Sequence, residues 1–341
     1  MKIIGIDGGA TKVSGAQVIR IDDQTFELIK PIKEIQYKDH KSYDSNFAPF
    51  TLEEQLANKE LTSTEQNQSQ LYIECITEVI EQIIEEDPIP IAIAMPGIKT
   101  ANKRGIKAMV NGPRIPNLCD ELEKRLSLKY KIQSIESDAD MCAWGEEFGK
   151  TGAFRNIENA YYIGGGTGTA DGLKLQGKLI SFDDAAKWIA KVWELVIEKD
   201  TSFESFSSMS GINQLRTSRS DKEIGLMLGN LLFERISTVF SGWNNQFMTD
   251  RNIENMHPYH GTLLDRIVIG QRVSDFLQSD QGAIIFSEVI ETLFINCMNS
   301  ETEIKNHFIN NEGFDKDRIV LSNLRSAPII GLAAKSCLVP C

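Results

Sequence analysis

Apolar residues in this chain gather in short runs that end at glycine-rich turns. Residues 2–6 form one such run before Asp7-Gly8-Gly9, and a second run follows and extends through Val18. Residues 160–163 lead in the same way into a segment rich in Gly and Thr, after which apolar positions resume at Leu173. Short apolar runs on both sides of a glycine turn are typical of strand–turn–strand hairpins. The pattern therefore predicts two hairpins, one at the start of the chain and one near residue 166.

Other parts of the chain have the spacing of amphipathic helices. Apolar residues recur every four positions over 71–83, ahead of a buried run over 89–95 that predicts a strand. Beyond residue 186 the pattern is mainly helical, and helices are predicted over 188–197, 224–243 and 282–298. The polar stretch 38–69 contains few aliphatic residues and is predicted to be a surface excursion or a partly mobile segment.

Composition and charge narrow the class of protein. A chain of 341 residues exceeds the usual size of one domain, so two lobes are expected. Its 41% apolar and 25% charged residues are typical of a globular protein, and the net charge of −12 argues against binding to nucleic acid. No apolar run reaches transmembrane length, no signal peptide is apparent, and the six cysteines are scattered without a CxxC pair. We therefore expect a cytoplasmic enzyme with reduced thiols and no membrane partner.

The first hairpin has the residues of a phosphate-binding turn. Gly8 and Gly9 allow the backbone to approach a ligand closely, and their N–H groups can point at phosphate oxygens. Asp7, at the strand end, is placed to hold a hydrated Mg²⁺, because hard cations take carboxylate oxygens and keep several waters. Thr11 and Lys12 add a hydroxyl and a positive charge. The alternative is an ordinary hairpin whose turn contains Asp-Gly-Gly.

The second hairpin carries another glycine turn, at Gly166-Thr167-Gly168. No helix follows these glycines and no Lys-Ser/Thr pair is present, so neither the Walker loop nor the dinucleotide fingerprint fits. Two glycine hairpins in separate halves of one chain suggest a clamp that closes on a polyphosphate from both sides.

An acidic cluster lies between the hairpins, where a short strand over 132–135 runs into a predicted helix. Asp138 would sit near the helix N-terminus, where the dipole and the unpaired N–H groups keep a carboxylate ionised. Such a carboxylate could accept the proton of a substrate hydroxyl while that oxygen attacks a phosphorus atom. The alternative is that Asp138 is simply the N-cap of the helix.

Several motifs in the same order resemble the ROK family of sugar kinases, members of the actin/hexokinase/Hsp70 superfamily of two-lobed ATP-binding folds. The family's opening Asp-x-Gly-Gly-Thr-Lys is similar to residues 7–12, which are shortened by one position before the glycines. Its Glu-Asn-Asp-Ala-Asn segment is matched by 136–140 and its Gly-Thr-Gly-Ile-Gly-x-Gly loop by 166–172. The similarity covers most of the chain and is completed by Pro96-Gly97, the segment 265–274 and the segment 319–334.

The resemblance implies an α/β protein with the two-lobed actin-like ATPase (ribonuclease H-like) fold and an ATP/sugar cleft between its lobes. Residues 1–135 would form the N-terminal lobe together with a returning C-terminal helix over 328–341, and residues 136–327 would form the C-terminal lobe. The implied activity is ATP-dependent phosphorylation of a hydroxyl of a hexose or amino-sugar, as in a glucokinase. ATP and Mg²⁺ are the implied cofactors, a monosaccharide is the implied substrate, and a homodimer is kept open.

The resemblance also assigns roles to single residues. Asp138 falls on the catalytic base, which also contacts the sugar, and Asp7 would hold Mg²⁺ through water. Asn111 falls where family members contact sugar hydroxyls. The residues implied to bind ATP are Asp7, Gly8, Gly9, Thr11, Lys12, Gly166, Thr167, Gly168 and Gly270.

The chain departs from the family after the second hairpin. Many members carry a Gly-Glu-x-Gly-His segment there, followed by a Cys-rich zinc knuckle, whereas residues 181–188 here contain neither His nor Cys. Zinc is therefore not expected, and His257 and His260 are more typical of surface or capping groups. Sugar recognition would then use Asp183, Asp184 and Lys187, which could equally be a solvated helix start.

Three substitutions within the matched motifs support a second interpretation. Ala170 replaces a glycine, Asp171 adds a carboxylate that would repel ATP unless it faces away, and Gln271 replaces the second glycine of the adenosine motif. The alternative is therefore a catalytically degenerate protein of the same fold that binds a sugar or nucleotide in a regulatory role. Retention of Asp7, Asp138 and the Gly-Thr-Gly loop favours the kinase.

Overall fold

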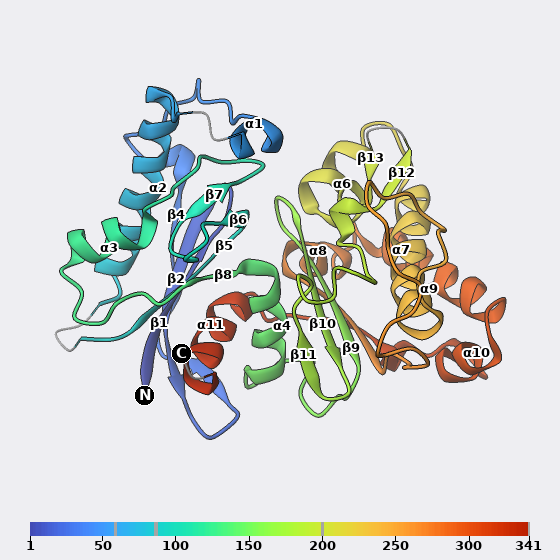
Figure 1. The fold of residues 1–341 in the computed structure, drawn as a ribbon. Helices are drawn as coiled ribbons and strands as arrows, with labels where there is room; N and C mark the ends of the chain where they lie inside the picture. The colour runs from blue at the N-terminus through green and yellow to red at the C-terminus, as the bar shows by residue number, and fades with distance from the viewer. Residues whose placement is uncertain (58–59, 85–87, 199–200, 340–341) are drawn as a thin grey trace. The chain divides into compact units, whose positions relative to one another are not determined.

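The computed structural model describes residues 1–57, 60–84, 88–198 and 201–339 (Figure 1). The chain forms two compact units. Unit 1 comprises residues 1–150 and 326–341, and unit 2 comprises residues 151–325. Among the described residues, no helix combines the length and the apolarity needed to cross a membrane.

Unit 1 is built on a six-stranded mixed sheet in the order β3-β2-β1-β5-β8, with β4 also paired to β2. The first hairpin, β1 (Lys2–Gly8) and β2 (Lys12–Arg20), is antiparallel, as predicted. The short strands β3 (Phe26–Leu28) and β4 (Lys33–Gln36) both pair antiparallel with β2. On the other side, β5 (Ile91–Met95) runs parallel to β1, and β8 (Ile135–Ser137) runs parallel to β5.

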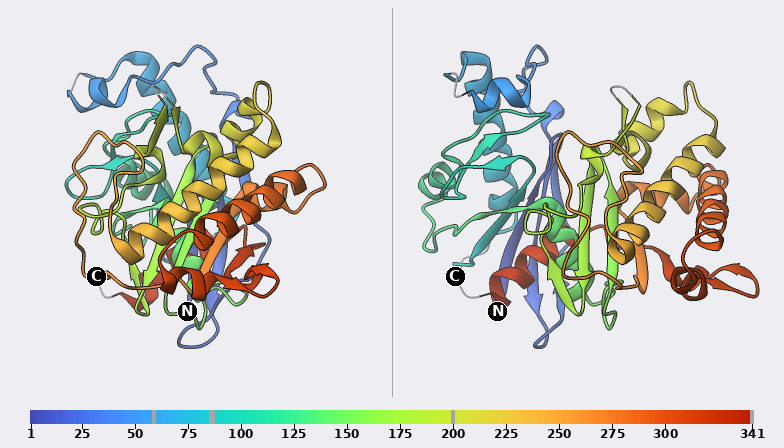
Figure 2. Two further views of the ribbon diagram at one scale, coloured as in Figure 1. Left: turned by 90° about the vertical axis from the view of Figure 1, so that its right-hand side faces the viewer. Right: turned by 45° about the vertical axis from the view of Figure 1, so that its right-hand side comes forward.

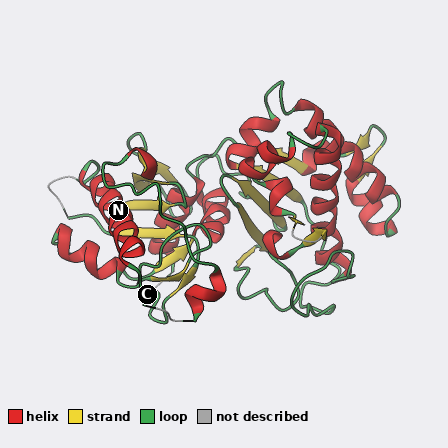
Figure 3. Ribbon diagram, turned by 90° about the horizontal axis from the view of Figure 1, so that it is seen from above, coloured by secondary structure: helices red, strands yellow, loops and turns green. Residues whose placement is uncertain are grey.

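Helices cover both faces of this sheet (Figure 3). Successive side chains of a strand point to opposite faces, so Gly5 and Gly15 show which helix lies on each. A Cβ atom added to Gly15 would lie 2.9 Å from Val79 of α2 (Ser63–Glu81). One added to Gly5 would lie 2.6 Å from the carbonyl oxygen of Ile329 in α11 (Ala327–Leu338). The sheet is thus the middle of three layers, with α3 (Leu118–Leu126) packed beside α2.

The polar stretch 38–69 is structured where it is described. It contains a 3₁₀ turn, η1 (Tyr37–Asp39), the short helix α1 (Leu52–Leu56) and the start of α2. Thr51 caps α1 and Thr62 caps α2 through their side chains. A small hairpin of β6 (Ile98–Lys99) and β7 (Ile106–Ala108) follows the Pro96-Gly97 turn.

The division between the units corrects the predicted boundary at residue 135/136. The helix that opens the predicted second lobe, α4 (Asp138–Phe148), belongs to unit 1, which extends to residue 150. The reason is its close crossing with α11. Gly145 of α4 lies against the Ala327 carbonyl and Gly331 of α11 against the Met141 carbonyl, so a Cβ atom at either glycine would overlap an oxygen.

Unit 2 repeats the strand scheme of unit 1. Its five-stranded sheet has the order β11-β10-β9-β14-β17. The second predicted hairpin is present as β9 (Ala160–Gly165) and β10 (Thr169–Leu175), which continues into β11 (Lys178–Ile180). Next to β9, β14 (Arg266–Gly270) and β17 (Ile319–Leu321) run parallel to it. In each unit, antiparallel strands at one side of the sheet are therefore joined to two parallel strands at the other, and unit 1 has the additional antiparallel strand β4.

Two long helices, α7 (Asp221–Ser241) and α9 (Ala283–Met298), run side by side in unit 2 (Figure 2). They agree with the helices predicted over 224–243 and 282–298. A Cβ atom added to Gly229 of α7 would lie 2.6 Å from Thr292 of α9, so a glycine permits the close approach. The smaller elements of unit 2 are η2 (Val192–Glu194), β12 (Val196–Glu198), β13 (Thr201–Ser202), α5 (Glu204–Ser207), α6 (Met209–Leu215), α8 (Gln271–Leu277), α10 (Thr302–Phe308), β15 (Ile309–Asn310), β16 (Gly313–Phe314) and η3 (Lys316–Arg318).

The helix predicted over 188–197 is wrong, because this segment holds only the single turn η2 and the strand β12. Buried side chains from elsewhere in unit 2 bind its backbone. Arg235 donates to the carbonyl of Ala190 at 2.6 Å, and the N–H of Val192 donates to Asp171 at 2.9 Å. These tertiary bonds occupy groups that a helix would pair internally.

Candidate active site

The turn of the first hairpin is held by its own backbone and by neighbouring aromatic residues. The N–H of Gly9 donates to the carbonyl of Lys12 at 2.8 Å, which closes the turn. The Tyr72 hydroxyl of α2 donates to the Ala10 carbonyl at 2.7 Å, and the Tyr37 ring stacks on the Tyr72 ring at 3.9 Å between centroids. A Cβ atom at Gly8 would lie 3.0 Å from Met95 of β5. The turn is therefore preorganised rather than loose.

Lys12, implied to bind phosphate, is engaged by another group in this structure. Its ammonium group forms an ion pair with Glu34 of β4, which also accepts a hydrogen bond from Ser14 at 3.0 Å. Burial acts to raise the pKa of Glu34. The hydrogen bond and the charge of Lys12, together with hydrogen bonds from Ser14 and Gln36, outweigh burial and lower the pKa below its usual value. Thr11 lies exposed at the tip, where its carbonyl accepts the Tyr37 N–H at 3.0 Å.

Asp7 and Asp138 influence each other electrostatically within unit 1. Asp7 is the penultimate residue of β1, beside β5, and Asp138 directly follows β8, the next parallel strand. Burial raises the pKa of Asp7 to about 7, and the negative charge of Asp138 contributes to the rise, while Lys12 opposes it. A carboxyl group whose ionisation is disfavoured by burial and by a nearby carboxylate is typical of a site that binds a cation or a proton. The two residues singled out from separate motifs are thus near enough for the charge of one to act on the other.

The N-cap interpretation of Asp138 is wrong. Helix α4 begins at Asp138, and the capping residue is Ser137, whose hydroxyl oxygen accepts the N–H of Asp140 at 3.5 Å. Glu136, two residues earlier, accepts hydrogen bonds from Lys335 of α11 and from Ser134, each at 2.6 Å. Burial acts to raise the pKa of Glu136, but these two partners outweigh it and lower the pKa. Asp138 is therefore placed at the helix start without serving as its cap.

Asn111 lies exposed in a loop that two side chains of the polar stretch support. Gln55 of α1 donates to the carbonyl of Met109 and accepts its N–H, both at 2.9 Å. Glu65 of α2 accepts the Nε and Nη2 groups of Arg114 at 2.8 and 2.7 Å, in a pair that is almost fully buried. The sequence did not single out Gln55 or Glu65, because a Gln or Glu in a polar stretch gives no local sign that it will be buried.

The backbone at the turn of the second hairpin is accessible at Gly166. The N–H of Gly166 donates to the carbonyl of Gly168 at 2.9 Å, and the Gly166 carbonyl accepts the N–H of Met209 at the start of α6 at 3.0 Å. A Cβ atom at Gly166 would meet nothing within 4 Å, so the space above this residue is free for a ligand. Thr167 lies between the two glycines, partly exposed. Gly166, Thr167 and Gly168 therefore share one tip in unit 2.

Asp171 does not face this tip. Asp171 is 3% exposed, and its carboxylate accepts hydrogen bonds from the Tyr161 hydroxyl at 2.6 Å and from the Val192 N–H at 2.9 Å. Burial raises the pKa of Asp171, and the nearby charge of Arg235 opposes the rise. Ala170 lies in the extended strand β10 opposite Gly164, where alanine is readily accommodated. Two of the three substitutions that supported a degenerate protein therefore leave the turn intact.

Glu204 is a candidate residue that sequence reasoning passed over. Its Oε1 atom accepts the N–H of Thr169 at 3.0 Å and would lie 2.8 Å from a Cβ atom at Gly168. Burial raises the pKa of Glu204, an effect that the Thr169 N–H opposes and the Asp171 charge reinforces. A partly buried acid with a raised pKa beside a glycine turn is typical of a functional site, but its burial and its contact with the turn have no signal in the sequence.

Gly270 ends β14 and makes room for a tyrosine. A Cβ atom at Gly270 or at Gly164 would overlap the Tyr162 hydroxyl, so both positions exclude a side chain. Gln271, the third substitution, has φ of 58°, a left-handed conformation that glycine adopts without strain. The second position of this motif thus has a backbone conformation that favours glycine, although the residue is Gln.

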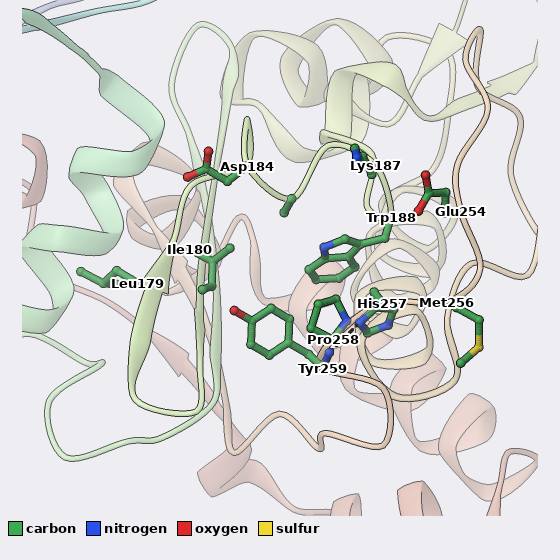
Figure 4. Close-up of a pocket in the computed structure, with 11 residues that line it drawn as sticks. Leu179, Ile180, Asp184, Lys187, Trp188, Glu254, Met256, His257, Pro258 and Tyr259 are labelled. Atoms are coloured by element: carbon green, nitrogen blue, oxygen red, sulfur yellow. Dashed lines mark hydrogen bonds between the residues drawn. The ribbon is translucent and has the colours of Figure 1, made fainter.

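The two aspartates predicted to bind sugar, Asp183 and Asp184, follow β11 and have different surroundings. Asp183 forms an exposed ion pair with Lys191 at 2.7 Å. Asp184 instead lines a cavity of about 430 Å³ (Figure 4). His257, at the same cavity, has both ring nitrogens engaged, with Nε2 at 3.0 Å from the Thr238 carbonyl and Nδ1 accepting the Tyr259 N–H at 3.2 Å. Among the residues that the structure describes, no group of three or more His, Cys, Asp or Glu side chains could hold a metal ion.

No protein-family model matches the sequence, and no curated protein matches it either. Solved structures match it over nearly its whole length. An inorganic polyphosphate/ATP-glucomannokinase from Arthrobacter sp. strain KM has a TM-score of 0.58 at 16% identity, covering 99% of this chain and 98% of that one. A ROK family glucokinase from Streptomyces griseus, in complex with glucose and AMPPNP, has a TM-score of 0.57 at 14% identity, covering 98% of each chain.

A regulator is also among the similar structures. A ROK family transcriptional regulator, a homolog of the E. coli MLC protein, has a TM-score of 0.54 at 12% identity, covering 99% of this chain and 78% of that one. At these identities the likeness shows the fold. The chain has the actin-like ATPase fold of the ROK sugar kinases, and the fold prediction is confirmed.

Proposed function

We propose that the protein transfers the γ-phosphoryl group of ATP to a hydroxyl of a hexose or amino-sugar. The observation that carries the proposal is the pairing of Asp7 and Asp138, two carboxylates from separate motifs that interact electrostatically beside the first glycine turn. The fold shared with an ATP-glucomannokinase and a glucokinase supports the reaction class. The particular sugar and hydroxyl are left to experiment.

Asp138 acts in this proposal as the general base. Its position at the first residue of α4 leaves the carboxylate at the helix start, while Ser137 does the capping. A carboxylate there can orient a sugar hydroxyl and accept its proton as the oxygen attacks phosphorus. Asn111, exposed on its supported loop, is a candidate to contact another hydroxyl.

The carboxylate of Asp7 fits a hydrated Mg²⁺ ion. Burial and the charge of Asp138 raise its pKa to about 7, so a nearby cation would relieve an existing repulsion. When bound, Mg²⁺ would neutralise part of the charge on the phosphates of ATP. Gly8, Gly9, Thr11 and Lys12 in unit 1 and Gly166, Thr167, Gly168 and Gly270 in unit 2 are the residues proposed to hold the nucleotide.

The decisive experiment is an ATP-consumption screen across monosaccharides, followed by the Asp138→Asn variant on the sugar identified. Loss of a general base should lower kcat by about 10²- to 10⁴-fold and change KM much less. Asp120→Asn is the matched control, because Asp120 is also an acidic residue in the first turn of a helix, α3, but pairs with Arg104. Undiminished turnover in Asp138→Asn would refute the assignment.

A catalytically degenerate regulatory protein remains the second candidate. Lys12 is paired with Glu34, Gln271 stands at a left-handed position suited to glycine, and a regulator shares the fold. Calorimetry with Mg·ATP separates the two candidates. Sugar-dependent release of ADP establishes the kinase, whereas sugar binding without any nucleotide binding favours the regulator.

A further inference from the structure

The cavity beside Asp184 is built from two segments of unit 2 that are distant in sequence. Residues 179–188 supply one group of lining side chains and residues 254–259 the other. In Figure 4, Ile180 and Asp184 lie on one side of the hollow and the rings of Trp188, His257 and Tyr259 on the other. Its volume of about 430 Å³ falls in the range of small-molecule sites.

The aromatic wall of this cavity is rigid. The Trp188 ring stacks on the His257 ring with 4.2 Å between centroids and an angle of 16°. Tyr259 lies 5.9 Å from Trp188 at a tilt, and both nitrogens of His257 are bound as described above. Burial lowers the pKa of His257, so the ring is neutral near pH 7 and serves as packing. A ligand would thus meet preformed ring surfaces.

The backbone on either side of Trp188 is also held by hydrogen bonds from residues outside this segment. Arg251 donates to the carbonyls of Ala186 and Ile189 and binds Glu194 through two hydrogen bonds of 2.8 and 2.9 Å. The N–H of Glu254 donates to the Lys187 carbonyl at 2.7 Å. The two segments that line the cavity are therefore tied to each other by hydrogen bonds at its edge.

The rim carries three charged side chains that are available to a ligand. Asp184, Lys187 and Glu254 are exposed at the cavity. In the described part of the chain, none of the three side chains makes a hydrogen bond or an ion pair. Their neighbour Asp183, by contrast, is engaged with Lys191. Two carboxylates and one ammonium give the rim a net negative charge, which disfavours a phosphate or carboxylate ligand.

We infer that this cavity is a binding site for a neutral carbohydrate ring. The C–H faces of a sugar ring are apolar and weakly positive, so they suit the electron-rich ring of the partly exposed Tyr259 and the small part of the buried Trp188 ring that reaches the cavity. The hydroxyl groups at the ring's edge can donate to Asp184 and Glu254 and accept from Lys187. The choice of a carbohydrate over other ring-shaped ligands rests on the proposed function, whereas the site itself is defined by unit 2 alone.

The experiment is calorimetric titration of the full chain, without ATP, using glucose, mannose, N-acetylglucosamine and glucose 6-phosphate. We expect saturable binding of at least one neutral sugar and weaker binding of the phosphorylated one. Asp184→Asn should weaken the affinity for the neutral sugar about tenfold or more, because it removes a charged hydrogen-bond acceptor. Asp183→Asn, its matched neighbour outside the cavity, should leave the affinity unchanged.

Three results would overturn the inference: no neutral sugar binds, glucose 6-phosphate binds as tightly as glucose, or Asp183→Asn weakens binding as much as Asp184→Asn. Both aspartates are exposed, so each variant is expected to fold, and unchanged circular dichroism checks this. Because no ATP is present, failure of the kinase proposal leaves this result unaffected. Conversely, ATP consumption without Asp184-dependent binding would refute the site and retain the kinase.

Discussion

Asp7 occupies a position that costs stability when its carboxylate is ionised. Its pKa is raised to about 7 by burial and by Asp138, against 3.8 for an unperturbed aspartate. The folded protein therefore keeps a proton on Asp7 up to about pH 7 that the unfolded chain releases near pH 4. Stability contributed by this group is lost as the pH rises from about 4 to about 7. Residues held in this way are common at functional sites.

We expect the Asp7→Asn variant to be more stable than the wild type at pH 8, by about 4 kcal/mol in the free energy of unfolding, because it removes the ionised carboxylate. At pH 4 the two proteins should be equally stable. The same variant should lose Mg²⁺-dependent ATP turnover. Thermal melts at both pH values measure the first effect. A variant that is less stable than the wild type at pH 8 would contradict the raised pKa.

At the scale of elements, the short helix α1 supports the loop that carries Asn111. The side-chain amide of Gln55 forms two hydrogen bonds with the Met109 backbone, as a neighbouring strand would: it donates to the carbonyl and accepts from the N–H. The Glu65–Arg114 pair holds the other end of the loop. A polar stretch that looked like a surface excursion thus orders a loop proposed to contact the substrate.

Gln55→Ala should raise the KM for the sugar several-fold and leave the KM for ATP unchanged, because it frees the loop without touching the glycine turns. The Met109 amide should also exchange its hydrogen faster, since it loses its acceptor. Gln66→Ala is the control, because Gln66 is an exposed residue of α2 whose side chain donates to the nearby Leu61 carbonyl rather than to the loop. Equal increases in both KM values would show that Gln55 has only a general structural role.

At the scale of the whole molecule, each unit has its own hydrophobic core and its own buried polar contacts. In unit 1 the backbones of α4 and α11 meet at Gly145 and Gly331. In unit 2 the fully buried Arg235 lies 3.0 Å from Glu234, binds the Ala190 carbonyl and faces the Tyr161 ring. Burial raises the pKa of Glu234, and the charge of Arg235 opposes the rise.

Two substitutions should therefore destabilise different units. Gly145→Ala places a Cβ atom on the Ala327 carbonyl and should cost about 1–3 kcal/mol in unit 1. Arg235→Met leaves Glu234 buried without its charge partner and should cost about 3–5 kcal/mol in unit 2. Calorimetric melts should show one component lowered in each variant and the other unchanged. A single transition that shifts in both variants would show that the units unfold together.

Local sequence patterns were sufficient to predict the elements whose structure depends on residues close together in the chain. The two glycine hairpins, the strand before Pro96 and the helices over 221–241 and 283–298 follow from short-range spacing of apolar residues and turn residues. The resemblance of the motif order added the fold, which similar structures confirm. The sequence by itself therefore determined the two hairpins, the strand before Pro96 and the two long helices of unit 2, and it singled out Asp7, Asp138 and Gly166–Gly168 as candidate residues.

The tertiary structure decided what depends on residues far apart in the chain. The predicted helix over 188–197 does not form because Arg235 and Asp171 bind its backbone, and α4 joins unit 1 because α11 packs against it across nearly two hundred residues. Likewise, Asp171 faces the core rather than the turn, and the pKa of Asp7 reflects an aspartate in a distant motif. Such pairings leave no local signal, because burial and charge depend on which segments meet in the fold.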